Sequence, residues 1–329
     1  MNQECLLSVE NLKTYFFTKS GVVKAVDGVT FSVSPGEALG IAGESGSGKS
    51  ITCLSLVRLV PQPAGRIVGG KVLFQGEDLL IKKEEEMREL RGKTIAMILQ
   101  DPLTSLNPVF TIGNQVGEVF KLNGDKKWKT IRAKAIDILN RVKIPSAEQR
   151  LNDYPFQFSG GMRQRVLAAV GIARKPKLLI ADEPTTSLDV TIQDQFLRLL
   201  KELQQRTEMS LILVTHDLGV VAETCDRVAI MYAGRIVEIG SVERVYHAPA
   251  HPYTNALMKA LPKLRGRTKR LYQIEGEPPN LYDLPSGCRF HPRCPMAKDI
   301  CREKYPPEVL VSGGGAAACW LLVNGGNHP

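Results

Sequence analysis

A glycine-rich segment at residues 43–50 constrains this chain more than any other feature of its sequence. The segment reads Gly-Glu-Ser-Gly-Ser-Gly-Lys-Ser and fits the pattern G-x-x-x-x-G-K-[ST], with an apolar stretch at 38–42 before it and a predicted helix at 50–59 after it. In such a loop the glycines let successive backbone N–H groups point at phosphate oxygens, and the helix N-terminus adds positive charge. We therefore expect nucleotide phosphates to bind at Gly43, Glu44, Ser45, Gly46, Ser47, Gly48, Lys49 and Ser50.

Two side chains of this loop have specific predicted roles. Lys49 would place its charge against the β- and γ-phosphates, and Ser50 would offer its hydroxyl to Mg²⁺. The alternative is a glycine-rich turn with an ordinary exposed lysine. The order of apolar stretch, loop and helix favours the nucleotide site.

A pair of carboxylates lies farther along the chain, in the sequence Leu-Leu-Ile-Ala-Asp-Glu at residues 178–183. Asp182, at the end of an apolar strand, can hold Mg²⁺ directly or through water. Glu183 is then placed to orient or deprotonate the attacking water. Taken alone, the pair would be two solvated acids at a strand tip. Together with the phosphate loop it indicates the second half of a nucleoside triphosphate site.

Strands and helices alternate around these motifs. Short apolar runs predict strands, and apolar residues spaced three to four apart predict a helix at 191–207. This alternation indicates an α/β fold with a sheet of buried parallel strands covered by helices. Residues 102–155 are predicted to be mostly helical. The predicted strands are 6–9, 15–17, 22–26, 29–33, 38–42, 95–99, 178–181, 211–214 and 228–231.

Composition limits the class of protein. The chain has 329 residues, of which 43% are hydrophobic and 23% charged, as in ordinary globular proteins. Its longest apolar-plus-glycine run is residues 313–323, whereas a spanning helix needs about 20 residues. The N-terminus lacks the basic start and apolar core of a signal peptide. We therefore expect a cytosolic protein that does not cross a membrane.

The charge and the cysteines leave two questions open. Lys+Arg 43 against Asp+Glu 34 gives a net charge of +9, which suits nucleic acid, an anionic membrane surface or a phosphate ligand. Four of the seven cysteines lie in residues 288–329, where such a cluster can form a metal site. The other three, Cys5, Cys53 and Cys225, are predicted to be small buried apolar residues.

Residues 158–162, Phe-Ser-Gly-Gly-Met, precede the carboxylate pair and continue into a predicted helix. This segment resembles the LSGGQ signature of the ATP-binding subunits of ABC transporters, with Phe158 for Leu and Met162 for Gln. Ser159 can donate a hydrogen bond to a γ-phosphate, and Gly160 and Gly161 expose N–H groups at a helix start. A Ser-Gly-Gly linker is the alternative interpretation.

Further positions match that family in their order and spacing. Gln100, at the end of a predicted strand, resembles the Q-loop glutamine, which senses the metal and the permease. Asp189, in the sequence Ser-Leu-Asp, resembles the D-loop residue at the dimer interface. His216 resembles the switch histidine that contacts the γ-phosphate. The resemblance also implies an aromatic residue stacked on adenine, for which Phe16 is our choice and Tyr15 the alternative.

The resemblance implies a fold and a mechanism. The fold is a P-loop core with a RecA-like parallel sheet, an N-terminal antiparallel β subdomain and a helical subdomain at about residues 102–165. Two such domains sandwich two ATP molecules head to tail, so Ser159 would complete the partner's site. ATP closes the dimer, hydrolysis reopens it, and the motion drives a permease. The implied catalytic residues are Glu183, His216 and Gln100, and the implied Mg²⁺ ligands are Ser50, Gln100 and Asp182.

Two segments point to one branch of the family. Residues 100–108 and the sequence Ala-His-Pro-Tyr-Thr at 250–254 resemble the oligopeptide/dipeptide importer ATPases. The second segment opens the C-terminal extension of that branch, which divides the chain into an ATPase domain at 1–249 and an extension at 250–329. By motif alone, His251 could instead be a loop residue that caps a helix.

The branch implies a function and partners. The chain would hydrolyse ATP to power the uptake of di- and oligopeptides, with a nickel complex, glutathione or an oligosaccharide as alternative cargo. Its partners would be a second ATPase subunit, expected to be a paralogue, two integral-membrane permease subunits and an extracytoplasmic solute-binding protein. It would lie at the cytoplasmic face of the inner membrane as a peripheral subunit, without nucleic acid.

The late cysteines form a group with wide spacing. They are wider apart than the pairs typical of structural zinc, and iron–sulfur ligation tolerates such spacing. Because some members of this branch carry a four-iron four-sulfur cluster here, we expect one, with zinc or unliganded thiols as alternatives. Arg289 and Arg293 could offset its charge. The expected ligands are Cys288, Cys294, Cys301 and Cys319.

Two other classes of protein compete with the importer. One is a soluble ABC protein acting on nucleic acid or ribosomes, but the chain has one phosphate loop and no long heptad run. The other is a redox-sensing module built around the cysteines. The basic run at 259–270, which would suit nucleic acid, is expected to lie near anionic lipid instead, or to be a solvated charged face.

Overall fold

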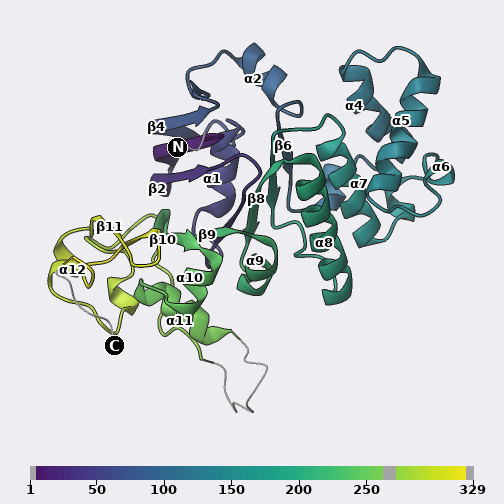
Figure 1. The fold of residues 1–329 in the computed structure, drawn as a ribbon. Helices are drawn as coiled ribbons and strands as arrows, with labels where there is room; N and C mark the ends of the chain where they lie inside the picture. Colours follow the sequence, from purple (N-terminus) through teal and green to yellow (C-terminus); the bar gives the residue numbers. More distant parts are fainter. Residues whose placement is uncertain (1–4, 262–271, 324–329) are drawn as a thin grey trace. The chain divides into compact units, whose positions relative to one another are not determined.

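The computed structural model describes residues 5–261 and 272–323, which form two compact units. The first unit contains the described parts of 1–33, 38–81 and 215–329, and the second contains 34–37 and 82–214. Figure 1 labels many of the elements of both units. The described part of the extension therefore belongs to the same unit as the N-terminal strands.

An antiparallel sheet opens the first unit. Its strands are β1 (Leu7–Thr18), β2 (Gly21–Val33), β4 (Gly65–Phe74) and β5 (Glu77–Asp78), in the order β2-β1-β4-β5. The four short strands predicted for residues 6–33 are wrong, because they join into two long ones. β-Bulges interrupt their pairing, and they coincide with the left-handed residues Asn11 and Gly28.

A second sheet of the first unit carries the phosphate loop at one strand end. β3 (Ala38–Ala42) pairs in parallel with β9 (Arg227–Tyr232), which pairs antiparallel with β10 (Arg235–Ser241). The extension adds β12 (Ala316–Ala318) to the free side of β10, and β11 (Glu308–Leu310) pairs with β12. The helices of this unit are α1 (Lys49–Leu56), α9 (Leu218–Thr224), α10 (Val242–His247), α11 (Pro252–Ala260) and α12 (Ile300–Glu303), with the 3-10 turn η2 (His291–Arg293).

The second unit has a parallel sheet in the order β8-β7-β6. Its strands are β6 (Ile95–Ile98), β7 (Leu178–Asp182) and β8 (Ser210–Thr215), and their side chains are almost all buried. This agrees with the continuous apolar runs that predicted them. The helices are α2 (Glu84–Leu90), α3 (Pro102–Ser105), α4 (Ile112–Leu122), α5 (Trp128–Arg141), α6 (Ala147–Arg150), α7 (Gly160–Ile172) and α8 (Val190–Thr207), with the 3-10 turn η1 (Pro155–Gln157).

The predicted organisation into a parallel sheet, an N-terminal antiparallel sheet and a mostly helical stretch is confirmed. Apolar residues of α5 that predicted this helix, Ile131, Ala135, Ile138 and Leu139, are buried. Among the described residues, no helix is both long and apolar enough to span a bilayer. The basic run at 259–270 lies mostly outside the described residues.

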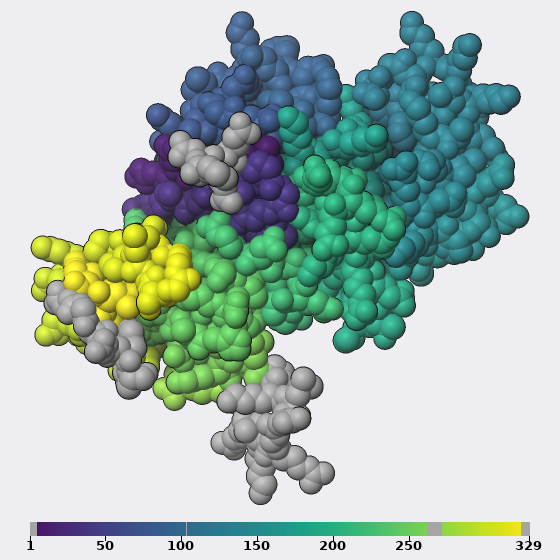
Figure 2. Space-filling model, in the orientation of Figure 1, coloured from purple at the N-terminus to yellow at the C-terminus, as the bar shows by residue number. Residues whose placement is uncertain are grey.

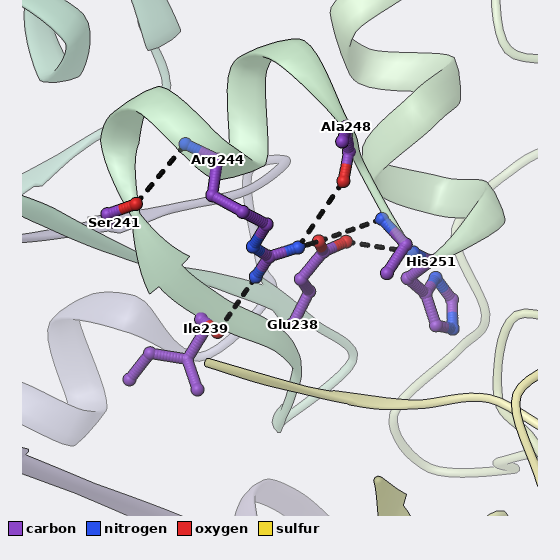
Figure 3. A network of polar contacts seen from close by, with 7 residues as sticks. Glu238, Ile239, Ser241, Arg244, Ala248 and His251 are labelled. Carbon is purple, nitrogen blue, oxygen red and sulfur yellow. Dashed lines mark hydrogen bonds and ion pairs between the residues drawn. The ribbon is translucent and has the colours of Figure 1, made fainter. Parts of the chain in front are cut away.

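A buried ion pair joins β10 to α10, and its carboxylate also contacts the start of the extension. The Glu238 carboxylate accepts hydrogen bonds from the Arg244 guanidinium and from the backbone N–H of His251 at 2.8 Å, as Figure 3 shows. Glu238 is 0% exposed, and Arg244 also donates to the Ile239 carbonyl at 3.0 Å. Because every strong charge here has a partner, the pair can be buried.

His251 caps the next helix. Its Nδ1 accepts a hydrogen bond at 3.0 Å from the N–H of Tyr253, in the first turn of α11. Burial lowers the pKa of His251 to about 3, so the ring is neutral and Nδ1 can accept. His251 therefore caps α11, which was the alternative interpretation of its motif.

The extension packs against the rest of the first unit through polar contacts as well as strand pairing. In Figure 2 its yellow atoms adjoin the green atoms of β10 to α11 and the purple atoms of the N-terminal strands. The Arg289 guanidinium pairs with Asp27 of β2, which also accepts from Tyr15 at 2.6 Å and from Arg235 at 3.1 Å. Burial alone would raise the pKa of Asp27, but the Tyr15 hydrogen bond and the two arginines lower it to about 2.

Candidate functional site

The phosphate loop follows β3 and enters α1 in a conformation that requires glycine. Gly43, Gly46 and Gly48 all have positive φ, and Gly48 is the N-cap residue of α1. A Cβ at Gly43 would lie 2.2 Å from the Met231 carbonyl oxygen, and one at Gly48 would lie 2.2 Å from that of Ala25. The backbone of neighbouring segments therefore lies in close contact with the loop at Gly43 and Gly48, so no larger residue fits at these two positions.

The side chains of this loop fit a phosphate ligand. Lys49 is buried, and its ammonium donates to the carbonyls of Gly43 at 2.9 Å and Glu44 at 3.0 Å. The Ser47 hydroxyl is buried and has no hydrogen-bond partner among the described residues. A buried cation and an unsatisfied hydroxyl beside a helix N-terminus are groups that a phosphate would satisfy.

The other predicted residues of the first unit are Phe16, Tyr15 and His216. Phe16 is half-buried on β1, where its ring approaches Gly65. Tyr15 donates to Asp27, and burial together with this bond raises the pKa of Tyr15 to about 12. His216 is exposed, and it precedes Asp217, which caps α9 through bonds from Gly219 and Val220.

In the second unit, two residues predicted from separate motifs come together. The amide Nε2 of Gln100 donates to the Glu183 carboxylate at 3.1 Å. Glu183 follows β7 with a left-handed φ of 43°, and its N–H donates to the Val214 carbonyl at 2.9 Å. A non-glycine residue in this conformation is strained, and such strain is common at functional positions. Asp182, the last residue of β7, is only 4% exposed.

The signature segment and the D-loop also meet in this unit. Ser159 caps α7 by accepting from the N–H of Met162 at 3.3 Å, and Asp189 caps α8 by accepting from Ile192 at 3.0 Å. A Cβ at Gly161 would lie only 2.4 Å from the side chain of Ile192, so the two helix starts are closely packed. The glycines there have a packing reason as well as a predicted binding role.

The two departures from the family signature have simple physical accounts. Phe158 is 2% exposed, and like leucine it has an apolar side chain that suits a buried position. Met162 contributes its backbone N–H to the Ser159 cap, which any residue except proline can supply.

The predicted site residues thus divide between the two units. The phosphate loop, Phe16 and His216 belong to the first, and the second holds Gln100, Asp182, Glu183, Ser159, Gly160, Gly161 and Asp189. Within the first unit, the structure also places residues of the extension on the phosphate loop. Tyr253 and Arg293 both contact Glu44, which lies 249 positions before Arg293. No spacing or motif in the sequence signals these contacts.

The predicted iron–sulfur site is wrong. No group of three or more His, Cys, Asp or Glu side chains in the described ranges is arranged to hold a metal ion. Burial raises the pKa of Cys288 and of Cys319 to about 11. The same finding also applies to the other two expected ligands, Cys294 and Cys301, and to the alternative of a zinc site.

Two further predictions, one about the arginines of this region and one about Cys5, need correction. Arg289 and Arg293 do not serve a cluster, because they pair with Asp27 and Glu44 respectively. Cys53 and Cys225 are buried as expected, but Cys5 is exposed.

Family models and known proteins match most of this chain. A family model described as ABC transporter matches residues 26–186, and one for the oligopeptide/dipeptide transporter C-terminal region matches 237–301. A probable peptide ABC transporter ATP-binding protein of Sinorhizobium fredii is 51% identical over 96% of this chain and 95% of its own length. The dipeptide transport ATP-binding protein of Escherichia coli is 47% identical over 98% of this chain and 99% of its own length.

A solved structure is similar in fold as well. The ATP-binding cassette MJ0796 bound to ADP and phosphate superposes with a TM-score of 0.64 at 25% identity. The match covers 72% of this chain and 98% of the cassette.

Proposed function

The chain belongs to the ABC transporter family of ATP-binding proteins, in the branch with the oligopeptide/dipeptide C-terminal region, and we propose that it is the ATP-hydrolysing subunit of a di- and oligopeptide importer. One observation carries this proposal. The phosphate loop and the extension occur on one chain that matches a dipeptide transport ATP-binding protein over 98% of its length.

ATP and Mg²⁺ are the proposed ligands. The phosphate loop from Gly43 to Ser50 would hold the phosphates, and Phe16 would stack on the adenine. Mg²⁺, when bound, neutralises phosphate charge. Ser50, Asp182 and Gln100 are the residues proposed to hold it. The Gln100–Glu183 hydrogen bond supports a shared role for these two side chains in hydrolysis.

We assign the remaining site residues to a dimer of ATPase domains. Ser159, Gly160, Gly161 and Asp189 would complete the site of a second ATPase subunit, which we propose is a paralogue. His216 would contact the γ-phosphate. The exposure of Ser159, His216 and Asp189 supports this assignment, since they are accessible to a ligand or a partner.

Glu183→Gln tests the catalytic role of the carboxylate. The amide keeps the size of the side chain but cannot accept a proton from water, so ATP turnover should fall by about 100-fold or more. ATP binding should persist, because the phosphate loop is unchanged. Turnover and ATP affinity of the assembled transporter measure the two effects. Wild-type turnover in this variant would contradict the role given to Glu183.

The partners are proposed to be two permease subunits in the membrane and an extracytoplasmic binding protein, with this subunit at the cytoplasmic face. An apolar surface on the second unit supports permease docking. Val109, Phe110 and Phe156 are 70%, 51% and 68% exposed. The Ile112 N–H donates to the Asp153 carbonyl at 2.8 Å, which joins the segments that carry them. Such exposed apolar groups are typical of interaction surfaces.

Phe156→Asp tests this surface. A charge in an apolar interface is unfavourable, so the variant should lose co-purification with the permeases by about tenfold or more. Leu122→Asp is the matched control, because Leu122 is 73% exposed at the opposite end of α4 from Ile112. Equal recovery of permeases with both variants would exclude this surface as the docking site.

The cargo is proposed to be peptide. The intact complex, with its binding protein, should show ATPase stimulation by di- or oligopeptides. Stimulation by glutathione, a nickel complex or an oligosaccharide, without stimulation by peptides, would replace the cargo and leave the ATPase assignment in place.

A further inference from the structure

Two residues of the C-terminal extension contact Glu44 of the phosphate loop. The guanidinium of Arg293 forms two parallel bonds to the Glu44 carboxylate, at 2.7 and 3.1 Å. The Arg293 side chain is only 4% exposed. The Glu44 side chain is 26% exposed, and a bidentate pair of this kind fixes orientation as well as distance.

A second contact holds the backbone of the same residue. The N–H of Glu44 donates to the hydroxyl of Tyr253 in α11 at 3.0 Å. Tyr253 is 0% exposed and packs in an aromatic cluster with Tyr232 and Phe290, at ring distances of 4.6 and 5.3 Å. Side chain and backbone of Glu44 are thus both held by residues of the extension.

Glu44 in turn touches the group that binds phosphate. The carbonyls of Gly43 and Glu44 accept the hydrogen bonds of the Lys49 ammonium. The contacts therefore form a continuous path from Arg293 and Tyr253, through Glu44, to Lys49.

A parallel path supports the far side of the loop. Arg289 donates to the Ala233 carbonyl, and the N–H of the next residue, Gly234, donates to the Ser47 carbonyl at 2.8 Å. Both arginines come from one short segment, residues 289–293, which lies against the ATPase part of the first unit.

We infer that Arg293 is a positioning residue for the phosphate loop, acting through Glu44, so that the ATP affinity of this site depends on the extension. This inference rests on the proposed function. A loop already held in its binding conformation loses less conformational entropy when phosphate binds. By reciprocity, ATP binding stabilises the contact of the extension with the loop.

Electrostatics alone gives a different expectation, which makes the inference testable. Removing the positive charge of Arg293 would weaken anion binding, but removing the negative charge of Glu44 would strengthen it. A positioning role weakens binding in both cases, because either substitution breaks the same bidentate pair.

The test titrates the full chain with Mg²⁺ and AMP-PNP, a non-hydrolysable ATP analogue, by calorimetry. Arg293→Ala and Glu44→Gln should each weaken binding by about 5- to 30-fold. The double variant should be no weaker than either single variant, since the pair acts as a unit. Arg293→Lys should be intermediate, because lysine keeps the charge without the bidentate geometry. Arg302→Ala is the matched control, an exposed arginine of the extension.

Hydrogen exchange of residues 288–294 gives a second readout. AMP-PNP should slow this exchange in the wild type and much less in Glu44→Gln. Wild-type affinity in both single variants, or tighter binding in Glu44→Gln, would overturn the inference. A lower melting temperature with unchanged affinity would also overturn it, because the contact would then be merely structural. No AMP-PNP binding by the wild type or Arg302→Ala would instead refute the proposed function.

Discussion

At the scale of single residues, glycine decides where backbones approach one another. Gly161 is an example outside the phosphate loop, because a Cβ there would lie 2.4 Å from the side chain of Ile192, whereas one at Gly160 would lie 3.5 Å from that of Leu188. Adjacent glycines of one motif therefore have different steric freedom. The motif alone does not distinguish them.

Gly161→Ala should destabilise the chain by about 1–3 kcal/mol, because the added methyl overpacks the contact between α7 and α8. Gly160→Ala is the control. It should be neutral or stabilising by up to about 1 kcal/mol, since alanine favours the helix. Urea unfolding followed by helical circular dichroism measures both. Equal midpoints for the two variants would show that the contact relaxes without cost.

At the scale of elements, the predicted functional residues also build the helix starts. Ser159 caps α7 and Asp189 caps α8. A cap residue lies at the N-terminus of its helix, so its side chain and the positively charged helix end face the same space. The residue types at Ser159 and Asp189 therefore have two explanations. Each residue caps a helix, and each is predicted to contact nucleotide.

The cap of α11 makes stability depend on pH. Because the pKa of His251 is about 3 when folded and 6.5 in the unfolded reference, the unfolded state binds more protons between these values. Stability should therefore fall as pH decreases below about 6.5, by about 1 kcal/mol between pH 7 and 5.5. His251→Asn keeps a capping oxygen but removes the titration, so its urea midpoint should depend less on pH.

Two charged groups face this part of the chain, Glu238 and Arg244, and both are retained in the His251 variant. His247→Asn, at an exposed histidine, is the matched control for the loss of an imidazole. A profile of His251→Asn identical to the wild type would show that His251 is not the titrating group.

At the scale of the whole molecule, the described part of the extension belongs to the first unit rather than to a separate one. It supplies β12 to the sheet, Arg289 to Asp27 and Arg293 to Glu44. Its described residues share one compact unit with the N-terminal strands. We therefore expect these segments to unfold together.

Arg289→Ala tests this cooperativity. Loss of its hydrogen bonds to Asp27 and to the Ala233 carbonyl should cost about 1.5–3 kcal/mol. Native-state hydrogen exchange should then quicken in both β2 and residues 288–294, with Arg302→Ala as the unchanged control. Faster exchange in the extension alone would show that it opens as a separate unit.

Local pattern predicted the parallel strands closely, since β7 and β8 exceed the predicted 178–181 and 211–214 by only one or two residues at their ends. It failed in the N-terminal sheet, where bulges within β1 and β2 broke the alternation and suggested separate strands. It also failed for the four late cysteines. Spacing along the chain does not determine whether thiols meet in a ligand geometry.

The sequence by itself determined the α/β class, the phosphate loop, the carboxylate pair and the family, because each depends on residues close together in the chain. Only the tertiary structure decided that Arg293 and Tyr253 reach Glu44, and that Arg289 reaches Asp27. The physical reason is that a buried arginine needs a carboxylate, but several carboxylates would satisfy it. Which one it meets follows from the packing of segments more than 200 residues apart.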